Sequence, residues 1–213
     1  MTSTKICGLS DPENLEVAVK EGARFIGLVF YPPSPRNVSF DTAWNLARAI
    51  PTGVRAVGLF VNPEDAQLER ILTGVQLDMI QLSGDETPGR INEIKTRFAM
   101  PIIKSIHLET ADDLNDIEGY EAAADWLLFD TKVTGEHGGT GKTFDWNILK
   151  ERIETQPFKK PWMLSGGLDA NNVQEALSIL KPDAVDISSG VESKRGIKDA
   201  AKIKDFITAV KTA

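Results

Sequence analysis

Short apolar runs alternate with amphipathic segments from one end of the chain to the other. The apolar runs carry few polar residues, which is typical of strands that are covered on both faces in a parallel sheet. Eight such strands are expected, at Lys5–Gly8, Phe25–Phe30, Val54–Val61, Met79–Leu82, Ile102–Ile106, Trp126–Asp130, Trp162–Leu164 and Ala184–Ser188.

A segment with helical periodicity follows each expected strand. The first has a clear start, because Asp11 can cap it and Pro12 suits the first turn, before Leu15, Ala18 and Val19 at helical spacing. The other helices are expected at Asp41–Ile50, Pro63–Thr73, Pro88–Phe98, Ala111–Glu118, Asp145–Ile153, Asn171–Leu180 and Lys198–Val210.

Eight strand–helix units predict an α/β fold with a parallel sheet and helical crossovers. Eight units also favour closure into a (β/α)8 TIM barrel over an open, doubly wound sheet. The length of 213 residues suits this, since such barrels commonly occupy about 200–250 residues as one unit. No linker or low-complexity segment divides the chain, so residues 1–213 are expected to form a single domain.

Composition and charge narrow the classes of partner. The net charge of −7 disfavours a nucleic-acid partner. Cys7 is the only cysteine, so no internal disulfide can form. The N-terminus lacks the apolar region of a signal peptide, and no apolar run approaches the ~18 residues of a membrane span. A cytoplasmic protein without membrane partners is therefore expected.

In a barrel of this kind, the active site forms at the carboxyl ends of the strands. That rule selects residues before any family is considered. The candidates are Cys7-Gly8, Arg36, Gln81 to Gly84, Asp130, Ser165-Gly166-Gly167 and Ser188-Ser189-Gly190.

The turns after the last two strands suggest a phosphate site. Gly166 and Gly167 would let backbone N–H groups approach an anion, and Ser188, Ser189 and Gly190 would add hydroxyl donors. Either turn alone could be an ordinary strand-to-helix connection. Their occurrence in adjacent units favours phosphate binding.

Three further candidates each have an ordinary structural alternative. Cys7 could be a small core residue, and Asp130 could cap the loop that follows its strand. Arg36 follows a proline-rich loop that could present the guanidinium to an anion, or it could be a solvated surface residue. His107 and His137 are assigned no role.

The segment from Gly138 to Thr143 ends like a P-loop. Walker A requires a glycine five positions before Gly141, and Glu136 stands there. The segment is therefore interpreted as a glycine-rich loop at the barrel mouth.

Together these pieces resemble the phosphoribosylanthranilate isomerase family. They occur in order over nearly the whole chain: Lys5-Ile6-Cys7-Gly8, Gly27–Tyr31 with Ser34-Pro35-Arg36, Val57–Asn62, Ile80-Gln81-Leu82, Phe129–Lys132, Gly138–Trp146, Leu164–Leu168 and Val185–Glu192. In one departure, Ser83 stands where the family usually has a histidine.

The resemblance implies an Amadori rearrangement of N-(5-phosphoribosyl)anthranilate in tryptophan biosynthesis, by proton transfers that need no metal and no organic cofactor. It implies Cys7 as general base, Asp130 as general acid and Arg36 on the anthranilate carboxylate. Gln81 and Asp186 would also contact substrate, Asp186 through a sugar hydroxyl. The implied phosphate ligands are Gly166, Gly167, Ser188, Ser189 and Gly190.

Two alternatives stay open at this point. One is a bifunctional phosphoribosyl isomerase that also acts in histidine biosynthesis, although the histidine-pathway enzyme has a carboxylate in place of Cys7. The other is a non-catalytic phosphosugar-binding barrel, which would need neither Cys7 nor Asp130. The expected partner is a small phosphosugar–anthranilate substrate, with the chain as a monomer or homodimer.

Overall fold

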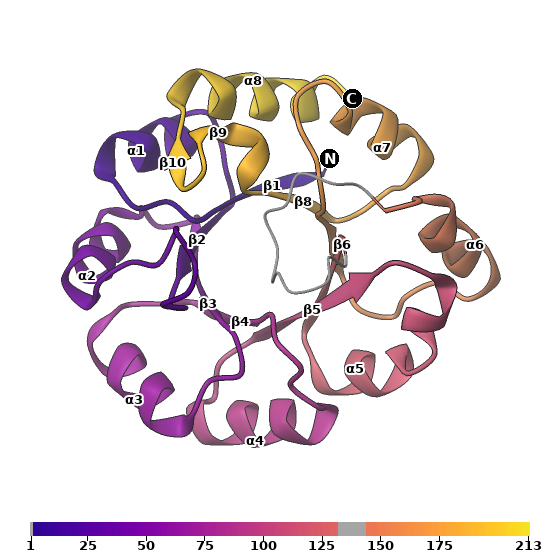
Figure 1. The fold of residues 1–213 in the computed structure, drawn as a ribbon, viewed down its shortest axis with the longest axis horizontal. Coiled ribbons are helices and arrows are strands. Elements are labelled where there is room, and N and C mark those ends of the chain that lie inside the picture. The colour runs from indigo at the N-terminus through magenta and orange to yellow at the C-terminus, as the bar shows by residue number, and fades with distance from the viewer. Residues whose placement is uncertain (1, 132–143) are drawn as a thin grey trace.

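The computed structural model describes residues 2–131 and 144–213, and its strands close into a parallel barrel in the order β1 to β8. Helices surround the barrel, as the view along its axis shows (Figure 1). The strands are β1 (Ser3–Cys7), β2 (Phe25–Val29), β3 (Arg55–Phe60), β4 (Met79–Leu82), β5 (Ile102–Leu108), β6 (Trp126–Thr131), β7 (Trp162–Leu164) and β8 (Ala184–Ile187). The predicted (β/α)8 barrel is confirmed.

The outer helices alternate with these strands along the chain. They are α1 (Pro12–Lys20), α2 (Phe40–Ala49), α3 (Asp65–Gly74), α4 (Pro88–Phe98), α5 (Ile117–Ala123), α6 (Asn147–Thr155), α7 (Val173–Ile179) and α8 (Ala200–Lys211). The expected start of α1 is confirmed, since the Asp11 carboxylate accepts a hydrogen bond from the backbone N–H of Asn14 and Pro12 opens the helix.

Most of the predicted helices differ from the structure by one or two residues at their ends, and two of the differences have a visible cause. The segment expected at Ala111–Glu118 is split into a 3-10 turn, η1 (Ala111–Leu114), and α5. The Asp113 carboxylate accepts from the N–H groups of Glu109 and Thr110, which favours this separate short turn. The helix expected from Lys198 begins two residues later, because Asp199 is its N-cap and Lys198 belongs to a strand.

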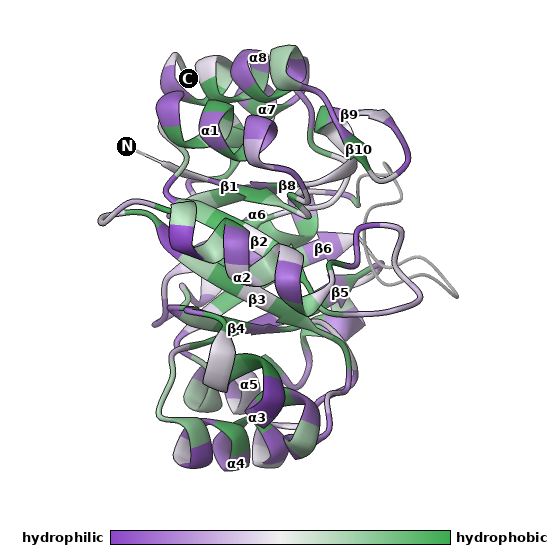
Figure 2. Cartoon of the chain, turned by 90° about the vertical axis from the view of Figure 1, so that its left-hand side faces the viewer, coloured by the Kyte–Doolittle hydropathy of each residue, from purple (hydrophilic) through white to green (hydrophobic). Residues whose placement is uncertain are grey.

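That strand is part of an insertion that the periodicity did not predict. After β8 come a 3-10 turn, η2 (Ser189–Val191), and the strands β9 (Glu192–Lys194) and β10 (Ile197–Lys198), which pair antiparallel. In the side view, this hairpin lies at the end of the barrel opposite the N-terminus (Figure 2). It therefore belongs to the end where the strands finish.

The strands bury both faces, with apolar colours gathered along them in Figure 2. One set of strand residues packs against the helices in the main core, while the alternating set forms a second cluster inside the barrel. The interior cluster consists of Phe25, Val57, Met79, Ile103, Leu128, Met163 and Ala184. The ring of Trp126 packs edge-on against Phe25 beneath them.

None of the helices in the described ranges has the length and apolar character needed to cross a membrane.

Candidate active site

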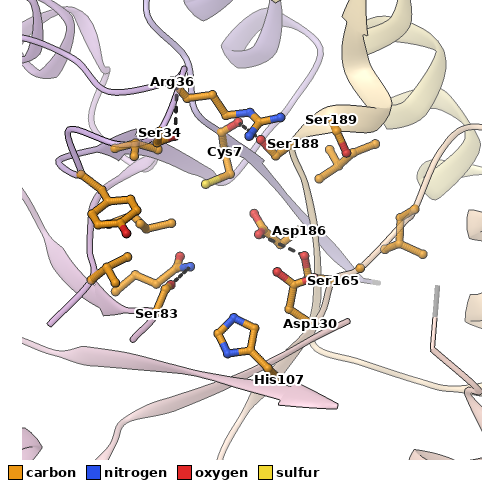
Figure 3. A pocket seen from close by; sticks show the side chains of 18 of the residues that line it. Cys7, Ser34, Arg36, Ser83, His107, Asp130, Ser165, Asp186, Ser188 and Ser189 are labelled. Carbon is orange, nitrogen blue, oxygen red and sulfur yellow. Dashed lines mark hydrogen bonds between the residues drawn. The ribbon is translucent and has the colours of Figure 1, made fainter. Parts of the chain in front are cut away.

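A cavity of about 690 Å³, counting its open mouth, lies at the carboxyl ends of the strands. Each of the eight strands, or the turn directly after it, contributes to its lining (Figure 3). The cavity brings together nearly all the predicted site residues: Cys7, Arg36, Gln81, Asp130, Gly166, Gly167, Asp186, Ser188 and Ser189. Gly190 is the predicted site residue that is not part of the lining.

Cys7 is the last residue of β1, and its thiol is buried at the cavity floor. Gly27 on the neighbouring strand makes room for it, since a Cβ at Gly27 would lie 2.9 Å from the Cys7 Sγ. Burial raises the pKa of the Cys7 thiol above its usual value, and the ammonium group of Lys5 acts against that rise. In the empty site the thiol form is therefore favoured at neutral pH.

Asp130 lies near the end of β6 and points into the same cavity (Figure 3). Its Oδ1 accepts a hydrogen bond of 2.8 Å from the backbone N–H of Thr131. Burial, together with the negative charge of Asp186, raises the pKa of Asp130 from 3.8 to about 7. The group is then roughly half protonated at neutral pH, which suits a proton donor.

Arg36 is buried and not a solvated surface residue, at 7% exposure. Its Nε and Nη2 donate to the two carboxylate oxygens of Glu192 at 2.6 and 2.9 Å. Gly8 makes room for its stem, because a Cβ there would lie 2.8 Å from the Arg36 Cδ. The bidentate pair with Glu192 is what fixes the guanidinium, in addition to the proline-rich loop.

Glu192 is itself held on several sides. Lys198 Nζ donates to its Oε1 at 3.0 Å, and the backbone N–H of Gly196 donates to its Oε2 at 2.9 Å. Burial alone would raise the pKa of Glu192, but the hydrogen bond from Arg36 and the charge of Lys198 lower it to about 2. The β9–β10 hairpin thus supplies a permanent carboxylate that orients Arg36.

The two glycine-rich turns lie side by side at the cavity, as predicted. Gly166 and Gly167 have φ values of +87° and +62°, which favour glycine and turn the backbone toward the cavity. Close packing also requires glycine at Gly190 and Gly166, because a Cβ at Gly190 would collide with the carbonyl oxygen of Leu168 and one at Gly166 with Oγ1 of Thr131.

The Ser188 hydroxyl is engaged within the protein. It donates to the carbonyl oxygen of Cys7 at 3.1 Å and accepts from Lys198 Nζ at 3.1 Å. Its one proton is therefore used within the protein, and its expected role as a hydroxyl donor to phosphate stays a prediction. Ser189 also lines the cavity.

Gln81 and Ser83 form a pair on the wall of the cavity. Gln81 Nε2 donates to Ser83 Oγ at 3.0 Å. Gln81 Oε1 is buried and has no hydrogen-bond partner within the described residues. A buried acceptor without a partner is costly, so this oxygen is suited to receive a hydrogen bond from a bound molecule.

Three residues were not predicted from the sequence: His107, which lines the cavity, and Glu192 and Lys198, which hold Arg36 and Ser188 beside it. His107 lies at the end of β5 and pairs in register with Asp130. Its alternation with Ile103 and Ser105 along the strand was a usable signal for an inward side chain. Glu192 and Lys198 gave no such signal, because their positions depend on the β9–β10 hairpin. The predicted loop at residues 138–143, like His137, lies outside the described residues.

No three His, Cys, Asp or Glu side chains are grouped as metal ligands in the part of the chain that the structure describes. The cavity instead combines a thiol, a carboxyl group, a buried guanidinium and a glycine turn. A (β/α)8 barrel with these groups at the carboxyl ends of its strands belongs to the class of barrel enzymes that act on small molecules.

Comparisons with known proteins identify the family within that class. Residues 4–209 match the family described as N-(5'-phosphoribosyl)anthranilate (PRA) isomerase. A relative of that name from Paramagnetospirillum magneticum is 48% identical over 97% of this chain and 96% of its own length. Another, from Paracoccus denitrificans, is 46% identical over 96% of this chain and 95% of its own length.

Solved structures agree with this result. The phosphoribosyl anthranilate isomerase of Thermotoga maritima superposes with a TM-score of 0.90 at 36% identity, with 100% of both chains covered. A second structure of such an isomerase, in complex with reduced 1-(o-carboxyphenylamino)-1-deoxyribulose 5-phosphate, gives a TM-score of 0.86 at 33% identity, again over 100% of both chains. The chain therefore belongs to the N-(5'-phosphoribosyl)anthranilate isomerase family.

Proposed function

We propose that Cys7 is the general base and Asp130 the general acid of the isomerisation of N-(5'-phosphoribosyl)anthranilate. Membership of the family assigns the isomerisation itself, a step of tryptophan biosynthesis, and with it a catalytic role for the chain. The observation that carries the residue roles is that a buried thiol and a carboxyl group with a pKa of about 7 share one cavity. They lie on β1 and β6, with only β7 and β8 between these two strands.

Asp130 begins the reaction. Its proton goes to the ring oxygen of the ribose, the bond from that oxygen to C1′ breaks, and the anthranilate nitrogen becomes an iminium. A carboxyl group with an ordinary pKa would hold few protons at neutral pH, whereas a pKa of about 7 leaves Asp130 substantially protonated.

Cys7 removes the proton from C2′, and the electron pair of that bond neutralises the iminium to give an enolamine. Because burial raises the pKa of the thiol, the thiolate is scarce before substrate binds. The iminium cation favours the thiolate when it forms, so deprotonation is coupled to the first step. Tautomerisation then moves a proton from the C2′ hydroxyl to C1′, and return of the Cys7 proton to Asp130 through solvent restores both groups.

The ends of the substrate have complementary surroundings. The backbone at Gly166 and Gly167 and the Ser189 hydroxyl would bind the phosphate. Glu192 occupies the Nε–Nη2 edge of Arg36, so the Nη1–Nη2 edge would bind the anthranilate carboxylate. The wall between them is apolar, which suits an aromatic ring, and consists of Val29, Leu59 and Val61.

The ribose would lie between the acid and the base. Gln81 Oε1 would accept a hydrogen bond from one of its hydroxyl groups, and Asp186 from another. Holding the sugar at both ends converts the proton transfers into reactions between fixed neighbours. A relative is in complex with reduced 1-(o-carboxyphenylamino)-1-deoxyribulose 5-phosphate, which supports binding of a molecule of this chemistry by the family's barrel.

The oligomeric state belongs to the proposal as well. A Thermotoga maritima relative is described as dimeric, and also as monomers generated from that dimer. A monomer and a homodimer therefore both have a counterpart in the family.

The test is Cys7→Ser. A serine hydroxyl has nearly the same shape as the cysteine thiol but does not ionise at neutral pH. Therefore kcat should fall by about 10²–10⁴-fold, the usual contribution of a positioned base. Turnover is measured by the loss of substrate fluorescence. Cys7→Asp should retain part of the activity, since a carboxylate is already a base.

Ser105→Ala is the matched control, because Ser105 is another small, buried polar residue inside the barrel and does not line the cavity. It should leave kcat close to the wild-type value. Wild-type turnover by folded Cys7→Ser would remove Cys7 from the mechanism.

A further inference from the structure

Lys5 is a charged side chain buried inside the barrel, with 0% exposure. It pairs in register with Phe25 of the interior cluster and with Asp186, so it points inward. Its Nζ lies 2.7 Å from Asp186 Oδ1, and Asp186 is 5% exposed. Burial alone would lower the pKa of Lys5, but the charges of Asp186 and Cys7 and the hydrogen bonds with them together raise it above its usual value, so the Lys5 amine keeps its proton.

Stability does not explain this ion pair well. Removing two charges from water costs about as much as their attraction returns, and an apolar pair of the same volume often serves a fold equally well. The neighbouring interior positions are indeed apolar, as Phe25 and Ala184 show. The presence of two buried charges is therefore better explained by the chemistry of the cavity.

The position of the pair supplies one. Lys5 lies two residues before Cys7 on the same face of β1. Asp186 is on β8, and Ser165, which follows β7, approaches it with Oγ 3.4 Å from Asp186 Oδ2. Asp130 comes next, on β6. Figure 3 shows the Asp186 carboxylate between Cys7 and Asp130. The positive end of the pair thus lies beneath the thiol, and the negative end faces the carboxyl group.

We propose that Lys5 is a positioning residue: with Asp186 it forms a fixed, oriented charge pair that favours the thiolate of Cys7 and the protonated form of Asp130. The inference rests on the proposed roles of Cys7 and Asp130. It explains how one cavity can favour the loss of a proton from the base beside an acid that keeps its own proton.

The electrostatics of the described residues agree with this geometry. Among the charged groups, Lys5 acts most strongly to lower the pKa of Cys7, and Asp186 acts most strongly to raise that of Asp130. Each partner also acts on the more distant group: Asp186 raises the pKa of Cys7, and Lys5 lowers that of Asp130.

Other charged groups face Cys7 from the elements around it. Lys198 of β10 also favours the thiolate. Arg36, from the loop after β2, has its charge balanced by Glu192. Asp130 of β6 and His107 of β5 line the opposite part of the cavity. Lys5 is distinguished from all of these by lying on the same strand as Cys7, directly beneath it.

The experiment uses Cys7 as its own probe. Cys7 is the only cysteine, so the rate of alkylation by iodoacetamide as a function of pH, without substrate, reports its ionisation alone. Lys5→Met removes the cation, so the midpoint of the plot of alkylation rate against pH should rise by about one pH unit or more. At a pH below that midpoint, such a shift means about a tenfold loss of thiolate. Asp186→Asn removes the anion, and the midpoint should fall.

The opposite directions are the decisive feature. A pair that only held the fold together would, on losing either member, loosen the site and move the midpoint the same way. The pKa of Asp130 should shift in the same two directions. Therefore the pH above which kcat/KM falls, where Asp130 loses its proton, should be higher in Lys5→Met and lower in Asp186→Asn.

Lys104→Met is the matched control. Lys104 is another buried lysine, 2.6 Å from Glu86, but it lies on the outer side of β5 beside Tyr120. Its loss should lower stability and leave the alkylation midpoint of Cys7 unchanged.

Shifts of Lys5→Met and Asp186→Asn in the same direction, or an unchanged midpoint in Lys5→Met, would overturn the proposal. If Lys5→Met does not fold, Asp186→Asn tests the proposal by itself: a raised or unchanged alkylation midpoint in that variant would overturn the proposal. The alkylation needs no turnover, so full activity of Cys7→Ser would reject the proposed base without touching this result.

Discussion

The two halves of the barrel interior differ sharply in character, although the same strands build both. On β4 to β8, an apolar residue of the lower half is followed two positions later by a polar residue of the upper half. The pairs are Met79 and Gln81, Ile103 and Ser105, Leu128 and Asp130, Met163 and Ser165, and Ala184 and Asp186. Each strand thus contributes one inward residue to the apolar core and the next to a polar layer, whose members all line the cavity except Ser105.

The lower half of the interior mainly stabilises the fold, whereas the upper half carries the chemistry. The lower residues lose water on folding and gain close packing, which stabilises the barrel. The upper residues lose water without comparable packing, and that loss alters their ionisation: the pKa of Asp130 rises to about 7. The lower layer makes the polar layer possible, because it supplies the rigid base on which charged groups can be held.

The largest effect is expected from Asp130→Asn in the upper half. The amide cannot donate an acidic proton to the ring oxygen, so kcat should fall by about 10²–10⁴-fold. The same substitution should raise the stability at pH 8, because it removes a carboxylate that burial makes costly to ionise. Steady-state turnover and thermal unfolding of one preparation measure both effects.

The sign of the stability effect follows from the pKa. Asp130 titrates near 7 in the fold and near 3.8 in the unfolded chain, so the cost of its charge is absent below pH 3.8 and complete above pH 7. At about 1.4 kcal/mol per pKa unit, a rise of about 3 units corresponds to a gain at pH 8 of about 4 kcal/mol. It should vanish near pH 4. An equal gain at both pH values would show that the charge is not its cause.

Leu128→Ala, two residues earlier on β6, should lower stability and leave the chemistry unchanged. Leu128 is 1% exposed in the interior cluster, and its truncation should lower the free energy of unfolding by about 2–5 kcal/mol. Chemical denaturation measures this loss. At a temperature where the variant is folded, the pH dependence of kcat should match the wild type. A displaced pH profile would mean that the two halves are not separable.

The smallest effect is expected from Arg36→Met, at the rim of the polar half. Loss of a hydrogen-bonded ion pair with the substrate carboxylate should weaken binding by about 1.5–3 kcal/mol, seen as a higher KM. An analogue without the carboxylate should bind both proteins alike. Lys202→Met is the control, because Lys202 donates to the backbone oxygen of Glu192 and should leave KM unchanged. If Arg36→Met weakened binding of the substrate and of the analogue equally, Arg36 would not bind the anthranilate carboxylate.

Much of the site could be predicted because the fold gives the position along a strand a fixed meaning. Residues at the carboxyl end of a barrel strand face the cavity, which placed Cys7, Gln81 and Asp130 correctly from the sequence. His107 escaped because β5 continues to Leu108, beyond its expected end at Ile106. The assignment of Gly190 to phosphate stays a prediction, and the structure adds that close packing against Leu168 requires a glycine there.

The sequence by itself determined the eight strands, their order and the end of the barrel that carries the chemistry. These follow from local information, since the apolar runs, the helix caps and the glycine turns each depend on residues close together in the chain. The family resemblance was also readable there, because its motifs are contiguous segments.

Only the tertiary structure decided which charges meet. Lys5 contacts Asp186, and Arg36 contacts Glu192, through closure of the barrel between β1 and β8 and through the hairpin that follows β8. Whether a carboxyl group is an acid at neutral pH depends on the water it loses and the charges it faces. Residues far away in the sequence exclude the water and supply most of the charges, although Lys5 lies only two residues before Cys7. The ionisation of Cys7 and Asp130 is therefore a property of the folded barrel.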